Sequence, residues 1–188
     1  MALNNILTLT LLAISLLLFS FSSNAENKKT ITLAYYQMNI DAGNVSGLKP
    51  LVVGLHANYA IWNGFSIEGR LAYPYDGARL IDGDNEIEID MSLISGAYIK
   101  YNAPLLANLF SPYVMFGQSY AEVEITAVKV DGVQALDNQA FSADSSAYGL
   151  GVDIKVSNKL FIGLEHMNYY DEESFEITAT ALNINYKF

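Results

Sequence analysis

The chain has 188 residues, of which 52% are hydrophobic and only 16% are charged, and its formal net charge is −10. This length suits one domain with a sizeable core, and the 13 Tyr and 9 Phe residues exclude a disordered chain. The absence of cysteine excludes a disulfide scaffold, a thiolate metal site and a cysteine nucleophile, and the acidic balance argues against a nucleic-acid partner.

The first predicted element is an export signal. An apolar run at residues 6–21 is followed by the small residues of a signal-peptidase site that ends at Ala25. The run is shorter than the roughly 20 residues of a membrane-spanning helix, which favours cleavage over an uncleaved anchor or a buried helix. No Lys or Arg precedes the run, which departs from the usual pattern. We predict a signal peptide at residues 1–25 and one domain at residues 26–188.

The rest of the chain alternates with a period of two, which is typical of β-strands. The last stretch is the clearest, because Leu182, Ile184 and Tyr186 fall on one side while Asn183 and Asn185 fall on the other. The same alternation predicts eight strands, at residues 30–40, 51–60, 65–73, 87–101, 112–125, 147–155, 160–170 and 177–188.

The predicted joins between these strands fall into two kinds. Compact joins lie at residues 62–64, 101–108 and 157–158, and longer joins rich in Asp, Asn and Gly lie at 41–47, 76–85, 126–144 and 171–174. Short and long joins tend to alternate along the chain. Strands of about 9–11 residues with such joins are typical of a transmembrane barrel.

The two sides of the predicted strands differ in composition. One side carries Leu, Ile, Val, Ala, Met and aromatic residues, whereas the other mixes Gly, Ala, Ser and Asn with charges of both signs. A narrow barrel needs small residues inside, and its buried charges must be paired. A soluble barrel would instead bury the apolar side. A sheet that spans a membrane must close on itself, and eight strands leave an interior that side chains fill. We therefore predict an all-β fold, an eight-stranded antiparallel transmembrane β-barrel; a soluble periplasmic β protein is the alternative.

Aromatic residues gather at both ends of the predicted strands, as the two interfaces of a bilayer favour. The set near the compact joins is Tyr59, Trp62, Phe65, Tyr101, Phe110, Tyr113, Tyr186 and Phe188. The set near the long joins is Tyr35, Tyr36, Tyr73, Tyr75, Tyr120, Tyr148, Tyr169, Tyr170 and Phe175. The alternative to two interfacial belts is that strands are rich in Tyr and Phe for reasons of packing alone.

Charged residues on the inner side predict a network that fills and stiffens the lumen. Its predicted members are Glu68, Arg70, Lys100, Glu122 and Glu165, with Asp153, Lys155 and Lys187 toward the compact joins. His56 alternates with Gly54 and Asn58 and is expected to join it. The alternative role of the network is to gate a narrow ion path.

The remaining charges are polarised along the predicted barrel. Acidic outer loops are predicted at Asp82, Asp84, Glu86, Asp171, Glu172 and Glu173. Lysines gather toward the opposite end, at Lys28, Lys29, Lys100, Lys155, Lys159 and Lys187. A plain solvated surface accounts for the acidic loops; the alternative is weak Ca²⁺ or Mg²⁺ binding that bridges to lipopolysaccharide phosphates.

With its export signal, its strand order and the terminal LNINYKF, the chain resembles the small outer-membrane β-barrels of Gram-negative bacteria, the OmpA/OmpX-like group and the related porin-family barrel domain. The stretches SPYVMFGQSYAEVE and LFIGLEHMNYYDEES are similar to the family's fifth and seventh strands. The resemblance implies an integral protein of the outer membrane, exported through the periplasm. It also implies an assembly signal that the barrel-insertion machinery reads, at Leu182, Ile184, Tyr186 and Phe188.

The resemblance implies a structural or surface-interaction role, with no cofactor, in a monomer that contacts outer-membrane lipid and lipopolysaccharide. A narrow porin-like channel for ions or small solutes is the alternative. A lipid-modifying enzyme is disfavoured: His166-Met167-Asn168 is similar to the His-x-Ser-Asn run of outer-membrane lipid A deacylases, but Asn168 stands in place of the nucleophilic serine. His166 is expected near the outer rim, and we expect no enzymatic activity.

Overall fold

The computed structural model describes residues 28–42, 45–76, 78–82, 85–130, 133–136, 139–172 and 175–188. The predicted signal peptide, residues 1–25, lies outside these ranges. Within the described part of the chain, no helix has both the length and the apolar character needed to cross a membrane.

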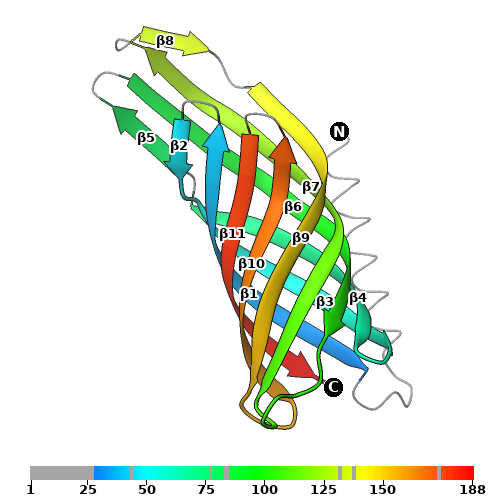
Figure 1. Ribbon diagram of the computed structural model, residues 1–188. Coiled ribbons are helices and arrows are strands. Elements are labelled where there is room, and N and C mark those ends of the chain that lie inside the picture. Colours follow the sequence, from blue (N-terminus) through cyan, green and yellow to red (C-terminus); the bar gives the residue numbers. More distant parts are fainter. Residues whose placement is uncertain are drawn as a thin grey trace.

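Eight long strands form a closed antiparallel barrel (Figure 1). They are β1 (Lys29–Ala42), β3 (Leu51–Trp62), β4 (Phe65–Asp76), β6 (Asn85–Asn102), β7 (Phe110–Val130), β9 (Gln139–Lys155), β10 (Leu160–Glu172) and β11 (Phe175–Lys187). Each long strand pairs with its neighbour in this order, and β11 pairs back to β1 along a continuous antiparallel ladder that closes the ring. The predicted eight-stranded antiparallel barrel is confirmed.

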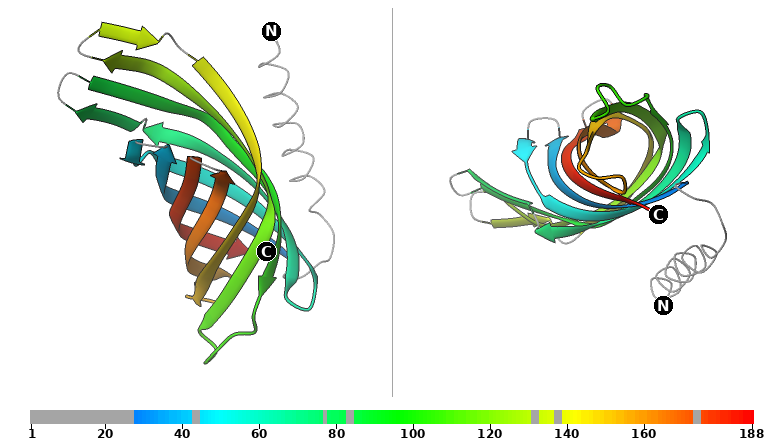
Figure 2. Two further views of the ribbon diagram at one scale, coloured as in Figure 1. Left: turned by 45° about the horizontal axis from the view of Figure 1, so that its top comes forward. Right: turned by 90° about the horizontal axis from the view of Figure 1, so that it is seen from below.

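Three short strands extend the sheet beyond the ring. β2 (Val45–Leu48) pairs with β1, β5 (Ala78–Asp82) with β6, and β8 (Val133–Leu136) with β7. Figure 2 shows the closed ring from below and the ends of β6 and β7, with β5 and β8, reaching out to one side. All three lie at the same end of the barrel, which we call the long-loop end. The opposite end, which we call the short-turn end, carries the beginning of β1 and the end of β11.

The strands of the long-loop end are longer than the sequence pattern predicted. The joins predicted at residues 76–85 and 126–144 are largely paired backbone, since β7 continues to Val130 and β9 begins at Gln139. Opposite them, Glu86 of β6 pairs with Lys129 of β7. Backbone hydrogen bonds alone can extend a hairpin past the barrel wall. The strands there need not alternate between apolar and polar residues, so the period of two did not predict them.

A two-residue turn joins β3 to β4 at the short-turn end. Asn63 and Gly64 both have positive φ, 42° and 85°, which is the geometry of a type I′ hairpin. A Cβ on Gly64 would lie 2.5 Å from the carbonyl oxygen of Asn102, so this position needs glycine.

Gly64→Ala is therefore expected to lower the free energy of unfolding by at least about 1–2 kcal/mol, because it combines left-handed backbone strain with a backbone clash. Gly69→Ala is the matched control on the same hairpin, since a Cβ there meets no atom within 4 Å. Urea titrations in lipid vesicles that found the two variants equally stable would contradict this interpretation of the turn.

Burial alternates along the barrel strands as the sequence predicted. On β3, Val52 and His56 are buried while Val53 and Leu55 are exposed. Large apolar side chains are exposed around the ring, including Leu33, Leu55, Ile67, Ile99, Val114, Phe116, Leu150, Ile162, Leu164, Leu182 and Ile184. The side predicted to face lipid is thus the outer wall of the barrel.

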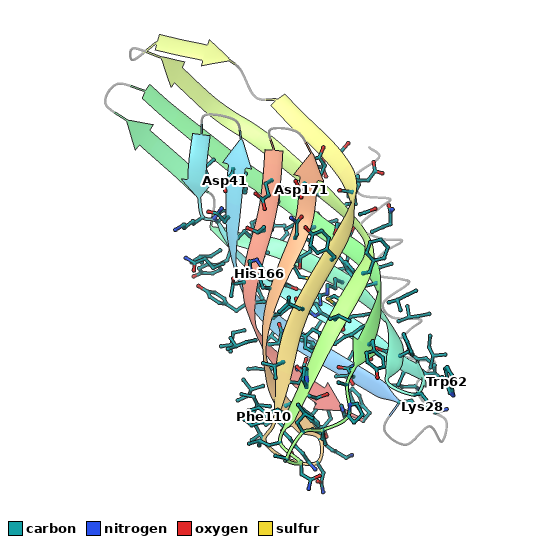
Figure 3. All side chains as sticks on the ribbon, viewed as in Figure 1. Lys28, Asp41, Trp62, Phe110, His166 and Asp171 are labelled. Atoms are coloured by element: carbon teal, nitrogen blue, oxygen red, sulfur yellow. The ribbon has the colours of Figure 1, made fainter. Side chains whose placement is uncertain are left out.

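Most of the predicted belt aromatics are on this outer wall. Those exposed at the short-turn end are Tyr59, Trp62, Phe65, Tyr101, Phe110, Tyr186 and Phe188, and those exposed toward the long-loop end are Tyr35, Tyr73, Tyr75, Tyr120 and Tyr148. Figure 3 shows Trp62 and Phe110 at one end and Asp41 and Asp171 at the other. The placement of three tyrosines was wrong, because Tyr36, Tyr113 and Tyr169 are buried in the lumen.

The apolar band of the outer wall ends on the short-turn side of His166. One cross-strand row on β10, β11 and β1 consists of Leu164, Leu182 and Tyr35. The row two residues further along each strand, toward the long-loop end, consists of His166, Thr180 and Gln37. His166 is exposed on this wall, and its Nδ1 lies 3.1 Å from Thr180 Oγ1 (Figure 3). Hydrocarbon therefore suits the wall below this row, and the interface suits the row itself.

Candidate functional site

The most highly organised polar site of the described residues is an ionic cluster in the middle of the lumen, formed by Glu68, Arg70 and Glu165. Glu68 and Arg70 are two residues apart on β4, so both side chains point inward. Glu165 reaches them from β10, across the barrel. All three side chains are almost completely buried.

Arg70 uses its guanidinium to join the two carboxylates. Its Nη1 and Nη2 donate to the two oxygens of Glu165 at 2.6 and 2.7 Å, which is a bidentate pair. Its Nε donates to Glu68 Oε1 at 2.7 Å. Bidentate charge-assisted hydrogen bonds of this length are the strongest kind between side chains. The cluster therefore fixes β4 to β10 across the lumen.

Tyrosines surround the ionic cluster. Tyr113 donates its hydroxyl hydrogen to Glu165 Oε2 at 2.8 Å, and Arg70 Nη1 lies 3.2 Å from the hydroxyl of Tyr169. The guanidinium carbon lies 5.0 Å from the ring centroid of Tyr98, within range of a cation–π contact. The sequence analysis did not identify these three tyrosines as partners of the ionic cluster in the lumen. Their parity was the available signal, since Tyr98 alternates in step with Lys100 and Tyr113 with Met115.

A second layer of polar contacts extends from Glu68. Asn58 donates to Glu68 Oε2 at 3.2 Å, and His56 Nδ1 lies 3.6 Å from Glu68 Oε1. His56 also hydrogen-bonds through Nε2 to the hydroxyl of Tyr36. The lumen thus contains His56, as its alternation indicated.

Lys100 connects the cluster to the short-turn end. Its Nζ lies 3.8 Å from an oxygen of Glu68 and 3.8 Å from an oxygen of Asp153, and 3.5 Å from the ring centroid of Tyr113. Asp153 also accepts a hydrogen bond of 2.8 Å from Asn185. Four of the five predicted network residues, Glu68, Arg70, Lys100 and Glu165, are therefore brought together.

The fifth predicted member, Glu122, is not in the lumen, so this prediction was wrong. Ser119 and Ala121 of β7 are buried, whereas Glu122 is partly exposed and shares the outward side of β7 with the exposed Tyr120. Glu122 was assigned by its charge rather than by its position in the alternation. It lies close to the long-loop end, where charge on the outer wall is compatible with water.

A polar cavity of about 170 Å³ lies on the short-turn side of the ionic cluster. We call it the vestibule. Its lining includes Thr30, Thr32, Asn58, Ser66, Glu68, Lys100, Asn102, Ser111, Asp153, Asn185 and Lys187. This composition suits ordered water that reaches the cluster from one end only.

The other side of the cluster is apolar, which the sequence analysis did not predict. An apolar layer of Met38, Ile40, Leu48, Val52, Met167 and Ile177 fills the lumen toward the long-loop end. Leu48 pairs with Ile40, and Ile40 pairs with Ile177 across β1 and β11. The carbonyl oxygen of Pro50 accepts a hydrogen bond from Met38 N at 3.1 Å, which holds the link between β2 and β3 along the edge of β1.

The predicted acidic loops lie mostly where side chains are not described. Asp171 is exposed at the long-loop end, whereas Asp84 and Glu173 lie outside the described residues, as do the side chains of Asp82, Glu86 and Glu172. Among the side chains that are described, no group of three or more His, Cys, Asp or Glu could hold a metal ion. Divalent-cation binding by the loops stays a hypothesis.

The residues of the predicted assembly signal share the outer wall of β11 and the chain end. Leu182, Ile184, Tyr186 and Phe188 are all exposed, and the rings of Tyr186 and Phe188 meet edge to face at 5.1 Å between centroids. Recognition of this surface by insertion machinery stays a prediction.

Comparison with known proteins shows the same architecture. The chain is similar in structure to Ail, the attachment invasion locus protein of Yersinia pestis, with a TM-score of 0.59 and 15% identity over 87% of this chain and 99% of Ail. It is similar to Neisserial surface protein A, with a TM-score of 0.57 and 13% identity over 85% of this chain and 97% of that one. It is also similar to the N-terminal β-barrel domain of Pseudomonas aeruginosa OprF, with a TM-score of 0.56 and 13% identity over 87% of this chain and 100% of that domain.

Sequence comparison extends this result. No curated protein matches the chain. The model of the outer membrane protein beta-barrel domain matches residues 8–188, nearly the whole chain. With the closed ring of eight strands and its apolar outer wall, this match shows that the chain belongs to the outer membrane protein beta-barrel domain family and is an integral outer-membrane protein.

Proposed function

We propose that the protein is a non-conducting barrel with a structural or surface-interaction role, which anchors its outer loops in the membrane and presents them to partners. One observation carries the proposal: the ionic cluster and the apolar layer fill the lumen one after the other. In this family short turns face the periplasm and long loops face outward, so the vestibule opens toward the periplasm.

The two layers oppose conduction for different physical reasons. An ion that entered from the vestibule would have to displace the bidentate pair of Arg70 and Glu165. It would then have to cross an apolar layer that includes Met38, Ile40 and Ile177, where an unpaired charge costs many kcal/mol. Because the two layers lie at different depths of the lumen, loss of the charges of the ionic cluster is expected to leave the apolar layer in place.

The refolded protein is therefore expected to show no discrete current steps in planar lipid bilayers. The informative variant is Glu68→Gln, Arg70→Met, Glu165→Gln, which removes the charges of the cluster and leaves the apolar layer intact. We expect it to be equally silent. Steady discrete conductance of the unaltered protein would overturn the proposal in favour of a narrow channel, and conductance of the variant alone would show that the ionic cluster is the only seal.

The proposal includes no enzymatic activity. The histidine on the outer wall, His166, contacts the hydroxyl of Thr180, and among the described residues no carboxylate pairs with it to complete a nucleophile, base and acid. Unchanged lipid A, by mass analysis of membranes with and without the protein, is the expected result. New or missing acyl chains would contradict it.

The proposed partners contact the outer wall, the loops and the last strand of the barrel. Outer-membrane lipid and lipopolysaccharide would contact the outer wall and loops of a monomer, and the insertion machinery would bind the strand that ends at Phe188 during assembly. The exposed apolar and aromatic side chains of β11 support the second of these contacts.

A further inference from the structure

A polar groove of about 310 Å³ lies on the outer wall, over β1, β10 and β11 and beside the link from β2 to β3. Gln37, His166 and Thr180 are exposed on this wall. Asn39 and Thr178 pair with each other two residues further along β1 and β11, so the alternation of the strands places them on the same side. We call this site the polar groove, and its polar lining consists of Gln37, Asn39, Lys49, His166, Thr178 and Thr180.

Apolar side chains border the polar groove on both flanks. On the neighbouring strand β3 the outward side chains stay apolar or aromatic as far as Leu51, which pairs directly with Gln37. On the other flank, the exposed Leu150 of β9 pairs with His166. The outer wall therefore becomes polar earlier on β1, β10 and β11 than on β3, and the polar groove indents the apolar band.

Several polar side chains of the groove have no partner in the protein. Within the described residues, the side chains of Gln37, Lys49 and Thr178 form no hydrogen bond or ion pair. Asn39 is different, because its Nδ2 donates to Asp41 Oδ2 at 2.6 Å. A carboxamide or hydroxyl at the border of hydrocarbon needs a hydrogen-bonding partner, since the bilayer core supplies no water. The polar groove thus has unused donors and acceptors on a wall that lipid contacts.

The surroundings of the polar groove favour an amphiphile with a hydrogen-bonding head group. The exposed Leu164, Leu182 and Tyr35 lie on its short-turn side, where acyl chains would extend. The exposed Glu176 lies on its long-loop side, which disfavours a site for phosphate alone. At the border of the hydrocarbon, a phospholipid offers ester carbonyls, which only accept hydrogen bonds. An acylated amino sugar offers amides and hydroxyls there, which match the carboxamides and hydroxyls of the groove.

We propose that the polar groove binds the acylated amino-sugar head group of a glycolipid in the outer leaflet, with the acyl chains along the row of Leu164 and Leu182. Gln37 and Thr180 exchange hydrogen bonds with the amides and hydroxyls of the sugar. Lipid A is the part of lipopolysaccharide that has this chemistry, so the proposal rests on the lipopolysaccharide contact proposed above and assigns it to the barrel wall. It is independent of whether the lumen conducts.

The test measures lipid retention by the refolded mature protein in detergent micelles, with native mass spectrometry as the readout. The probes are lipid A and phosphatidylglycerol, which is anionic but has no amide. We expect lipid A to be retained preferentially. Gln37→Leu with Thr180→Val should weaken its retention by about 20-fold, since each hydrogen bond contributes roughly fivefold, and should leave phosphatidylglycerol unaffected.

The matched control is Gln118→Leu with Ser146→Ala. Gln118 and Ser146 are also a paired amide and hydroxyl exposed on the outer wall, on β7 and β9 outside the polar groove, so lipid A retention should not change. Heat-modifiable migration on gels verifies that each variant is folded. Lipid A retention that the groove variant does not weaken, or that both variants weaken equally, would overturn the groove and leave a lipopolysaccharide contact elsewhere. Retention of lipid A no better than that of phosphatidylglycerol by the unaltered protein would overturn both.

Discussion

Arg70→Met is expected to lower the free energy of unfolding by about 3–5 kcal/mol, the cost of leaving buried charges without their partner. The side chain of Arg70 is the counter-ion of both Glu68 and Glu165, and all three are buried. Methionine keeps the apolar stem of the side chain but lacks the guanidinium, whose Nη2 lies 3.0 Å from Met115 Sδ, so the loss includes some packing as well as electrostatics. Denaturant titration in lipid vesicles, followed by the fluorescence of the sole tryptophan, Trp62, gives the free energy.

Removing all three charges should restore most of that stability. In the variant Glu68→Gln, Arg70→Met, Glu165→Gln no charge remains stranded, and neutral replacements of buried ion pairs are often tolerated. Lys49→Gln, on the exposed surface, should change stability little. If Arg70→Met were as stable as the unaltered protein, or if the triple variant were much less stable than Arg70→Met, the ionic cluster would not have the role assigned to it.

Leu33→Arg is expected to cost about 2–4 kcal/mol in vesicles, the penalty of a cation on the lipid face near the middle of a barrel wall. Leu33 is 53% exposed and pairs with Leu55 on one side and Ile184 on the other, in the middle of the apolar band. In a water-soluble protein the same substitution of an exposed leucine would change stability by no more than about 0.5 kcal/mol. The sign and size of the effect therefore report which solvent contacts this wall.

Gln37→Arg on the same strand is the matched control. Gln37 pairs with Thr180, in the row where the outer wall becomes polar, so an arginine there is expected to cost about 0–1 kcal/mol. Equal costs at Leu33 and Gln37 in the same titration would contradict the depth assigned to the two positions.

Much of the barrel could be predicted from the sequence because lipid outside and charge inside impose a strict period of two. Leu182 and Ile184 face out while Asn183 and Asn185 face in, and the same contrast separates Leu55 from His56. Where one face of a strand contacts lipid and the other contacts the polar lumen, the odd or even position of a residue is enough to predict which way its side chain points. The ends of β6 and β7 were not predicted, because beyond the ring the strands no longer separate lipid from lumen and their backbone pairing does not require alternating residues.

The errors at individual residues came from residue type outweighing position. Glu122 was placed inside because it is charged, yet the buried Ser119 and Ala121 of β7 put it on the outer side. Tyr113 and Tyr169 were placed in the belts because they are aromatic, yet their hydroxyls are hydrogen-bonding partners of the ionic cluster. A phenol is suited to both environments, so only its parity distinguishes them.

The apolar layer could not be predicted by either rule. Ile40, Val52 and Ile177 lie on the inner side of their strands, where the sequence analysis expected small or polar residues. They are buried where β2 continues the β1 ladder beyond β3, with Ile40 paired to Leu48 and Met38 N bonded to the carbonyl oxygen of Pro50. Their burial in one cluster joins residues of β1, β2, β3 and β11, and no local pattern encodes it.

The most direct test of the account is the solvent that surrounds the outer wall. Because the chain has no cysteine, single cysteines at residues 33 and 171 can be spin-labelled in turn in vesicles without background. A label in place of Leu33 should collide far more often with oxygen, which dissolves in hydrocarbon, than with a water-soluble nickel chelate, and a label in place of the exposed Asp171 should show the reverse. A label at residue 33 that is as accessible to the nickel chelate as one at residue 171 would contradict an apolar wall held in the membrane.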